Sequence, residues 1–180
     1  MPLEDIAREA GVSIGTLYNR FPARGSLVEA ALVDKVAGMV ADAESASANV
    51  DPWEGFAWFL GRCCEVQAAD RGYNELCVRV LPDTPEIDRL KARGHDLVNV
   101  IVQRAQRAGQ LRGDFHDGDF AFILWSTATI IDATAATAPE AWRRHLAFLL
   151  DGLRASAAHP LPGPPLSQDE VAEAMRTNGG

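Results

Sequence analysis

Apolar side chains recur every three or four residues along most of this chain. No stretch alternates apolar and polar residues in the way that half-buried β-strands do. The spacing predicts helices, which we place at residues 3–10, 14–21, 24–46, 51–70, 73–81, 83–108, 117–134 and 139–156. The pattern therefore predicts an all-α fold.

Local signals mark where two of the longer helices begin and where the last one gives way to a tail. Asp51 and Glu54 flank a proline, which combines an N-cap carboxylate with an acid in the first turn. Thr137 and Glu140 have the spacing of a capping box ahead of the last long helix. The prolines and glycine of residues 159–165 (HPLPGPP) predict an extended, flexible segment.

Residues 3–27 carry the most specific pattern in the chain. The first helix of this stretch gathers its apolar side chains on one face, and Gly11 permits the left-handed backbone that ends a helix. Ser13 is suited to cap the next helix, which buries Leu17 and Phe21 and turns polar side chains outward. A short helix that is held from behind by another, with small polar and aromatic groups facing out, is typical of a helix-turn-helix.

This segment resembles the DNA-binding head of the TetR (tetracycline-repressor-like) transcriptional regulators. The resemblance is carried by residues 6–13 (IAREAGVS), residues 15–18 (GTLY), Phe21, Pro22 and Arg24. Three short helices that simply begin a bundle are the alternative, but a generic bundle does not require these residues in this order. The resemblance implies a homodimer, usually a repressor, that leaves its double-stranded DNA operator when a small ligand binds the C-terminal domain.

The resemblance also implies that the second helix of the motif faces the major groove. The candidate DNA-binding residues are Ser13, Thr16, Tyr18, Asn19 and Arg24. Asn19 has the short amide that can pair with adenine through two hydrogen bonds. Arg24, near the start of the following helix, is suited to hold a backbone phosphate. Because phosphate contacts carry no sequence information, these residues do not define the operator.

The chain departs from the family pattern at two places. The resemblance implies a further helix before residues 3–10, and without it we expect parts of Ile6, Leu17 and Phe21 to be exposed. Ile14 stands where the family often has Lys or another polar residue, so one potential phosphate contact is absent. A dimeric small-molecule-binding module, with DNA binding impaired because the first helix is missing, is therefore the alternative function.

The net charge of −8 argues against DNA binding at first sight, but the distribution of charge matters more. Residues 13–25 contain Arg20 and Arg24 and no acidic side chain, which gives a local charge of +2. Residues 1–30 sum to only −1. We expect modest non-specific affinity, so that specific binding needs a dimer.

The last two long helices, at residues 117–134 and 139–156, are too apolar for an outer layer exposed to water. Part of each must belong to the internal core, which is the plainer interpretation. Pairing with a symmetry mate would bury the remainder as a four-helix interface, and the family uses its last two helices in this way. The candidate dimer-interface residues are Phe120, Ile123, Trp142, Leu146, Leu149 and Leu153.

Helices of the C-terminal region also carry apolar side chains with polar ones among them. Apolar walls with a few polar anchors describe a small-molecule site, although an ordinary core with a polar rim has the same pattern. The candidate ligand-binding residues are Phe59, Cys63, Asn99, Val102, Trp125 and Thr129. The implied effector is a small apolar or aromatic molecule.

Other functions have little support in the sequence. Cys63, Cys64 and Cys77 give no disulfide framework, which fits a reducing cytoplasm, and the first two have the apolar neighbours of inert thiols. His116 lies among acidic residues, which we interpret as a solvated loop and not as a metal site. With no long apolar run or signal-peptide pattern, we expect a cytoplasmic protein without membrane contact. We expect no cofactor and no catalysis; a helical enzyme is the third alternative.

These interpretations divide the chain into three parts. Residues 1–45 form a helix-turn-helix DNA-binding head with a linking helix, and residues 46–158 form a helical-bundle body for ligand binding and dimerisation. Residues 159–180 form a Pro-rich flexible tail. The expected function is that of a repressor that a small molecule releases from its operator.

Overall fold

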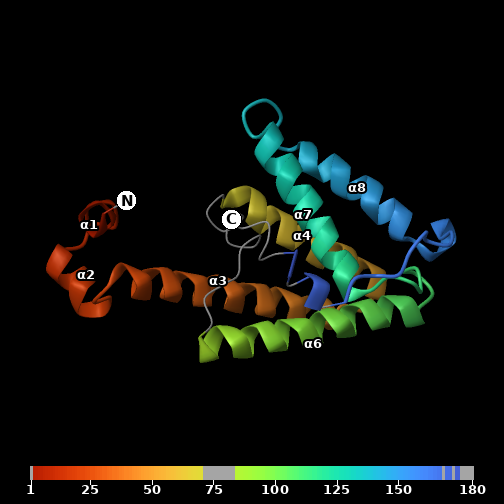
Figure 1. Cartoon of the computed structure of the whole chain (residues 1–180), viewed down its shortest axis with the longest axis horizontal. Coiled ribbons are helices and arrows are strands. Elements are labelled where there is room, and N and C mark those ends of the chain that lie inside the picture. Colours follow the sequence, from red (N-terminus) through yellow and green to blue (C-terminus); the bar gives the residue numbers. More distant parts are fainter. Residues whose placement is uncertain (1, 71–83, 168, 172, 175–180) are drawn as a thin grey trace. The chain divides into compact units, whose positions relative to one another are not determined.

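The computed structural model describes residues 2–70, 84–167, 169–171 and 173–174. Its helices are α1 (Leu3–Glu9), α2 (Ile14–Arg20), α3 (Arg24–Ser47), α4 (Pro52–Ala69), α6 (Pro85–Arg107), α7 (Asp117–Thr134) and α8 (Ala141–Leu153), followed by the 3₁₀ turn η1 (Ala155–Ala157) (Figure 1). Within these ranges the only β-pairing is an isolated bridge between Leu111 and Arg154. The all-α prediction is confirmed, whereas the helix predicted at residues 73–81 lies outside the described residues. None of the described helices is both long and apolar enough to cross a membrane.

The chain divides into two compact units, Met1–Gly38 and Met39–Gly180. The boundary falls inside α3, so that one continuous helix belongs to both units. The sequence predicted that the head ends at residue 45, because residues 45–50 interrupt the helical pattern of apolar side chains. The helix runs on to Ser47, and the hydroxyls of Ser45 and Ser47 donate to the carbonyls of Ala41 and Glu44 in the preceding turn, at 3.0 and 2.8 Å, so both polar side chains are accommodated within it.

The first unit has a small core of its own. Leu3, Ala7 and Leu17 form its buried centre, and Ile6 and Phe21 pack against it while staying partly exposed. The expected exposure of Ile6 and Phe21 is therefore confirmed. The expectation for Leu17 is wrong, because Leu3 and Ala7 of α1 are enough to cover its side chain.

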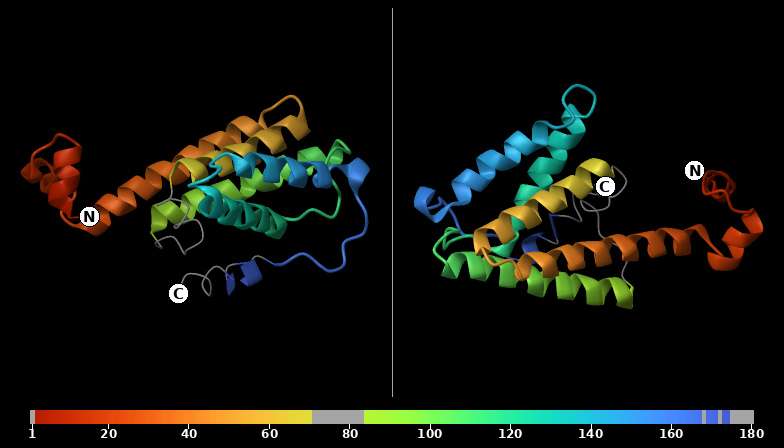
Figure 2. Two further views of the ribbon diagram at one scale, coloured as in Figure 1. Left: turned by 90° about the horizontal axis from the view of Figure 1, so that it is seen from above. Right: turned by 180° about the vertical axis from the view of Figure 1, so that it is seen from behind.

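In the second unit, α4 is the central helix, since α6, α7 and α8 all pack against it (Figure 2). Asp51 begins α4 as predicted: its carboxylate accepts the backbone N–H groups of Trp53 at 2.9 Å and Glu54 at 3.2 Å. The bond from Glu54 is the main reason that the pKa of Asp51 is lowered. One turn on, Phe56 is fully buried, with ring centroids 5.7 Å from Trp53 and 5.5 Å from Phe115.

The end of α3 lies in close contact with α4 and α6. A Cβ atom at Gly55 would lie 2.6 Å from the carbonyl oxygen of Ala46, so a larger residue at this position would force the two backbones apart. The guanidinium of Arg104 donates to the carbonyls of Ser47 and Asn49, the second at 2.6 Å. A cation beside the last carbonyls of a helix also complements the helix dipole. These contacts fix where α3 ends.

The predicted start of α8 is wrong. The helix begins at Ala141, and Glu140 precedes it without a side-chain cap. Thr137 does not act as a cap because its segment closes as a turn, in which the backbone N–H of Thr137 donates to the Thr134 carbonyl at 3.0 Å. Thr137 therefore belongs to the turn that ends α7 and does not cap α8.

The flexibility of residues 159–180 stays a prediction, and the described residues that follow α8 contact the rest of the second unit. Arg112 is buried, and its guanidinium binds both carboxylate oxygens of Asp114, at 2.6 and 3.0 Å, and the carbonyl of His159 at 2.7 Å. A Cβ atom at Gly118 would lie 2.5 Å from the carbonyl oxygen of Leu166. The tail is thus packed against the connection between α6 and α7, through contacts distant in sequence.

An ion-pair cluster joins α4 to α8. Glu65 accepts hydrogen bonds from Arg62 at 2.7 Å and from Arg143 at 3.2 Å. The bond from Arg62 first, and then that from Arg143, lowers the pKa of Glu65 below its ordinary value of 4.5. A carboxylate with a lowered folded pKa stabilises the fold above its unfolded pKa, and the stabilisation is lost as the pH falls through the folded value.

We therefore expect Glu65→Gln to lower the thermal midpoint at pH 7, and the difference from wild type to shrink as the pH falls below 4.5. The loss at pH 7 should not exceed about 1 kcal/mol because the pair is partly exposed to water. Calorimetry of both proteins at several pH values measures this. Glu54→Gln, an exposed change on the same helix, is the control; a difference for Glu65→Gln that is independent of pH would contradict the assignment.

Candidate nucleic-acid interface

The turn between α1 and α2 is built by a glycine and a serine. Gly11 has φ +68°, the left-handed conformation that ends helices, and its N–H donates to the Arg8 carbonyl at 3.2 Å. Two residues on, the Ser13 hydroxyl accepts the backbone N–H of Thr16 at 3.0 Å and begins α2. Both signals in the sequence are therefore confirmed, and together they set α2 across α1 as in a helix-turn-helix.

Nearly the whole circumference of α2 is exposed in this unit, and Leu17 is its one buried residue. Tyr18 is 45% exposed and Asn19 is exposed beside it. Within the described part of the chain, no hydrogen bond engages either side chain. Ile14 on the same helix offers an exposed apolar side chain, the kind of group that contacts thymine methyls. The outward face of α2 thus combines unengaged polar groups with a small apolar surface.

Two of the other candidate DNA-binding residues have local partners. The hydroxyls of Ser13 and Thr16 lie 2.7 Å apart, and Ser13 also caps α2. Both side chains are exposed, but their hydroxyls are already engaged in hydrogen bonds at the start of α2. Arg24 is the first residue of α3, and its side chain lies outside the described ones. The contacts of these residues with DNA stay predictions.

The cations of the first unit differ in what they can offer a phosphate. Arg8 on α1 is already paired with Asp5 at 2.6 Å. Arg20, the last residue of α2, is exposed, and its guanidinium carbon lies 5.7 Å from the ring centroid of Phe21. Because α2 carries no acidic residue, Arg20 makes this helix locally positive.

The candidate ligand-binding residues of the second unit do not gather around one described cavity. Phe59, Cys63 and Val102 are buried in the core, where the Phe59 ring stacks on Phe120 with centroids 5.8 Å apart. Asn99 and Trp125 are partly buried, and Thr129 is exposed. Beside Cys63, burial raises the pKa of the Cys64 thiol to about 11, so this thiol stays neutral at pH 7. The binding role of the six residues stays a prediction.

The candidate dimer-interface residues fall into two groups. Ile123, Trp142 and Leu146 are buried within the chain's own core, because α7 and α8 pack on α4, and they leave no apolar surface for a partner. Phe120, Leu149 and Leu153 are partly buried and pack against the same core. The large apolar side chains that remain exposed on these helices are Phe122, at 44%, and Phe148, at 62%. The sequence analysis did not include either among the interface residues; for Phe122 the reason is that α7 is apolar on nearly every side.

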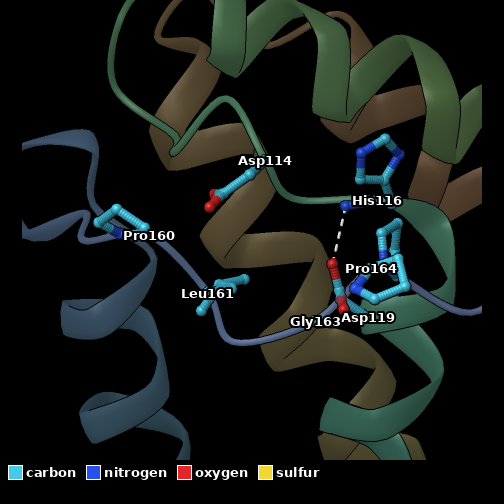
Figure 3. A pocket seen from close by; sticks show the side chains of 8 residues that line it. Asp114, His116, Asp119, Pro160, Leu161, Gly163 and Pro164 are labelled. Atoms are coloured by element: carbon cyan, nitrogen blue, oxygen red, sulfur yellow. Dashed lines mark hydrogen bonds between the residues drawn. The ribbon is translucent and has the colours of Figure 1, made fainter.

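One cavity is formed by the packed tail and the start of α7 (Figure 3). It has a volume of about 310 Å³ and is lined by Asp114, His116, Asp119, Pro160, Leu161, Gly163, Pro164 and Pro165. None of the candidate ligand-binding residues lines it. The Asp119 carboxylate accepts the backbone N–H of His116 at 2.9 Å, so it serves to cap α7. No group of side chains with the makeup of a metal site occurs among the described residues.

A helix-turn-helix with an outward, polar second helix, joined by a long helix to a helical body, defines a DNA-binding transcriptional regulator. Residues 1–31 match the model of the bacterial regulatory proteins of the tetR family, and residues 51–155 match the C-terminal domain of SbtR-like transcriptional regulators. The chain belongs to the TetR family of transcriptional regulators.

Solved structures agree with this assignment. The chain is similar to the TetR transcriptional regulator SCO0520 from Streptomyces coelicolor, with 28% sequence identity and a TM-score of 0.58. The similarity covers 85% of this chain and 87% of that protein. No curated protein matches the chain. The likeness thus extends over both units and supports a shared architecture of head and body.

Proposed function

We propose that this protein is a dimeric repressor, and that a small apolar or aromatic molecule releases it from a double-stranded DNA operator in the cytoplasm. The observation that supports this best is the outward face of α2, where Tyr18 and Asn19 are exposed and unengaged beside Arg20. Asn19 would read a base edge and Arg20 would hold a phosphate, while Tyr18 can do either.

Dimerisation is needed because one head is a weak DNA ligand. Residues 1–30 carry a net charge of −1, so the electrostatic contribution of a single head is small. Two heads related by symmetry would enter successive major grooves, roughly 34–36 Å apart. The exposed rings of Phe122 and Phe148 support α7 and α8 as the surface that joins two copies.

The ligand would act through α3, the one helix that belongs to both units. A ligand that binds the body in one conformation better than in another shifts the population toward the first. Release requires that the favoured conformation spaces the two heads wrongly for the operator. The coupling free energy for such regulators is typically about 1–3 kcal/mol.

Selection of bound duplexes from a random pool, followed by fluorescence anisotropy on the selected sequence, tests DNA binding. We expect Tyr18→Ala and Asn19→Ala each to weaken binding by about 5- to 150-fold, the value of roughly 1–3 kcal/mol for a good base contact. Both side chains are exposed, so light scattering should give an unchanged mass. Val50→Ala, at a position 95% exposed in the body, is the matched control.

The same measurements can contradict the proposal. Variants of Tyr18 and Asn19 that bind as tightly as wild type would mean that α2 does not read the operator. A wild-type protein that selects no duplex sequence would favour the alternative, a dimeric small-molecule-binding module with impaired DNA binding. Partly exposed Ile6 and Phe21 in the head give that alternative its structural basis.

A further inference from the structure

The exposed apolar side chains of the first unit gather at one place. Among its described residues, the large apolar side chains that remain exposed are Val12, Ile14 and Tyr18, at 40%, 38% and 45%. None of the three belongs to the buried core of this unit or to the apolar side chains that pack against that core. Single exposed apolar residues are common, but a group within residues 12–18 indicates a surface that another molecule covers.

The helical positions of α2 show which of its sides faces outward. Leu17 is the buried residue of this helix. At about 100° per residue, Gly15 and Asn19 lie on the side opposite Leu17. Ile14 and Tyr18, one turn apart, form the apolar flank of that side. The outward side of α2 therefore has a residue without a side chain and a short amide at its centre.

Among the described residues, nothing within the protein requires a glycine at position 15. A Cβ atom at Gly15 would meet only the Oγ atom of Ser13, at the ordinary contact distance of 3.8 Å. The described glycines with a positive φ are Gly11 and Gly109, so the backbone of Gly15 also suits an alanine. Alanine is the better helix former of the two. What the missing side chain allows is the close approach of another molecule to the backbone of α2.

The chemistry beside this gap is apolar. The hydroxyls of Ser13 and Thr16 lie 2.7 Å apart and are already engaged with each other. Ile14 has no polar atom in its side chain. In the major groove, the base edges present hydrogen-bond donors, acceptors and a single kind of apolar group, the C5-methyl of thymine. An exposed apolar flank on a helix that enters this groove therefore matches a thymine.

We propose that Ile14 and Gly15 select a thymine in each half of the operator. Ile14 contacts the C5-methyl group, and Gly15 leaves the gap that lets α2 come close enough to the base edges for this contact. The inference rests on the proposed operator binding and adds to it a residue that determines sequence preference. It also assigns a base contact to the position where a phosphate contact is absent.

Replacing a thymine by deoxyuridine removes only its methyl group and so tests this contact directly. In the duplex that wild type selects, each thymine is replaced in turn, together with its symmetry mate in the other half-site. At one position the affinity should fall by roughly 4-fold per half-site, or about 16-fold for the dimer, which is the value of one buried methyl group in each head. Ile14→Ala should show no loss at that position, because the partner of the methyl group is gone. Fluorescence anisotropy measures all four affinities.

Asn19→Ala is the matched control, since Asn19 lies on the same side of α2 and its replacement leaves Ile14 in place. This variant should bind less tightly but keep the loss at the replaced thymine. A selected duplex in which no thymine methyl matters, or an equal loss for wild type and Ile14→Ala, would overturn the inference and leave operator binding intact. A wild-type protein that selects no duplex would overturn both.

Gly15→Ala separates the interface from the fold, because its two expected effects have opposite signs. Alanine favours the helix and fits beside Ser13, so the thermal midpoint should not fall. The added methyl group holds α2 away from the groove, so operator affinity should fall by about 10-fold or more as base contacts are lost. Gly61→Ala on α4, where a Cβ atom meets nothing within 4 Å, is the control and should bind the operator as wild type does. Unchanged operator affinity in Gly15→Ala would overturn the proposed close approach.

Discussion

Phe148→Glu is expected to convert the protein from a dimer to a monomer and to weaken operator binding by about 100-fold or more. Phe148 on α8 is 62% exposed, and Phe122 on α7 is 44% exposed. Burying a phenylalanine side chain contributes about 1.5–3 kcal/mol, and a two-fold axis counts each residue twice. A glutamate would instead place a hydrated carboxylate, next to the Arg144 guanidinium that now lies 4.8 Å from the Phe148 ring centroid, in each half of the interface, and the cost of removing its water opposes association.

The loss of DNA affinity follows from the loss of the second head. Joining two binding modules raises overall affinity by about 10²–10⁴-fold over one module, and a monomer forfeits this gain. Light scattering measures the mass, and anisotropy on the selected operator measures the affinity. Because Phe148 is exposed in the single chain, its replacement should leave the thermal midpoint of the monomer fold nearly unchanged.

Val50→Glu serves as the control, since it adds the same charge at a position 95% exposed and outside α7 and α8. It should remain dimeric and bind the operator as wild type does. If Phe148→Glu also remained dimeric, α8 would not form the interface, and the partner surface would have to be sought elsewhere on the chain.

The sequence was a good guide where structure depends on neighbouring residues. The cap at Asp51, the left-handed turn at Gly11 and the cap at Ser13 all depend on backbone groups within three residues. The helical spacing of apolar residues also indicated which faces of α1 and α2 meet in the core of the head, although Leu17 is more fully buried than expected. Local chemistry therefore predicted most of the candidate DNA-binding face.

The sequence was a poor guide where two distant segments compete for the same surface. Residues 117–134 are apolar on nearly every side, so periodicity could not show that Ile123 faces the core and Phe122 faces water. The packed tail depends on the missing side chain of Gly118, which admits the carbonyl of Leu166. The sequence does indicate that Thr127 is buried. It lies four residues from both Ile123 and Ile131, so this polar residue falls on the buried apolar face of α7.

The largest loss of stability is expected from Phe56→Ala. Phe56 has no exposed surface, and its ring contacts those of Trp53 on α4 and Phe115 before α7. Truncation of a buried phenylalanine to alanine typically costs about 3–5 kcal/mol, because the cavity that remains collapses only in part. For a chain of this size the thermal midpoint should fall by roughly 6–20 °C.

Trp58→Ala is the matched control for this change, because Trp58 lies on the same helix and is 43% exposed. Removing its larger side chain should cost far less than removing Phe56, since much of its surface already meets water. Calorimetry of the three proteins measures the difference. Equal losses at the two positions would mean that size alone, and not burial between Trp53 and Phe115, determines the cost. A loss at Phe56 of about 3–5 kcal/mol would be a large share of the 5–15 kcal/mol that stabilise most folded proteins, so the contact between α4 and Phe115 would limit the stability of the whole body.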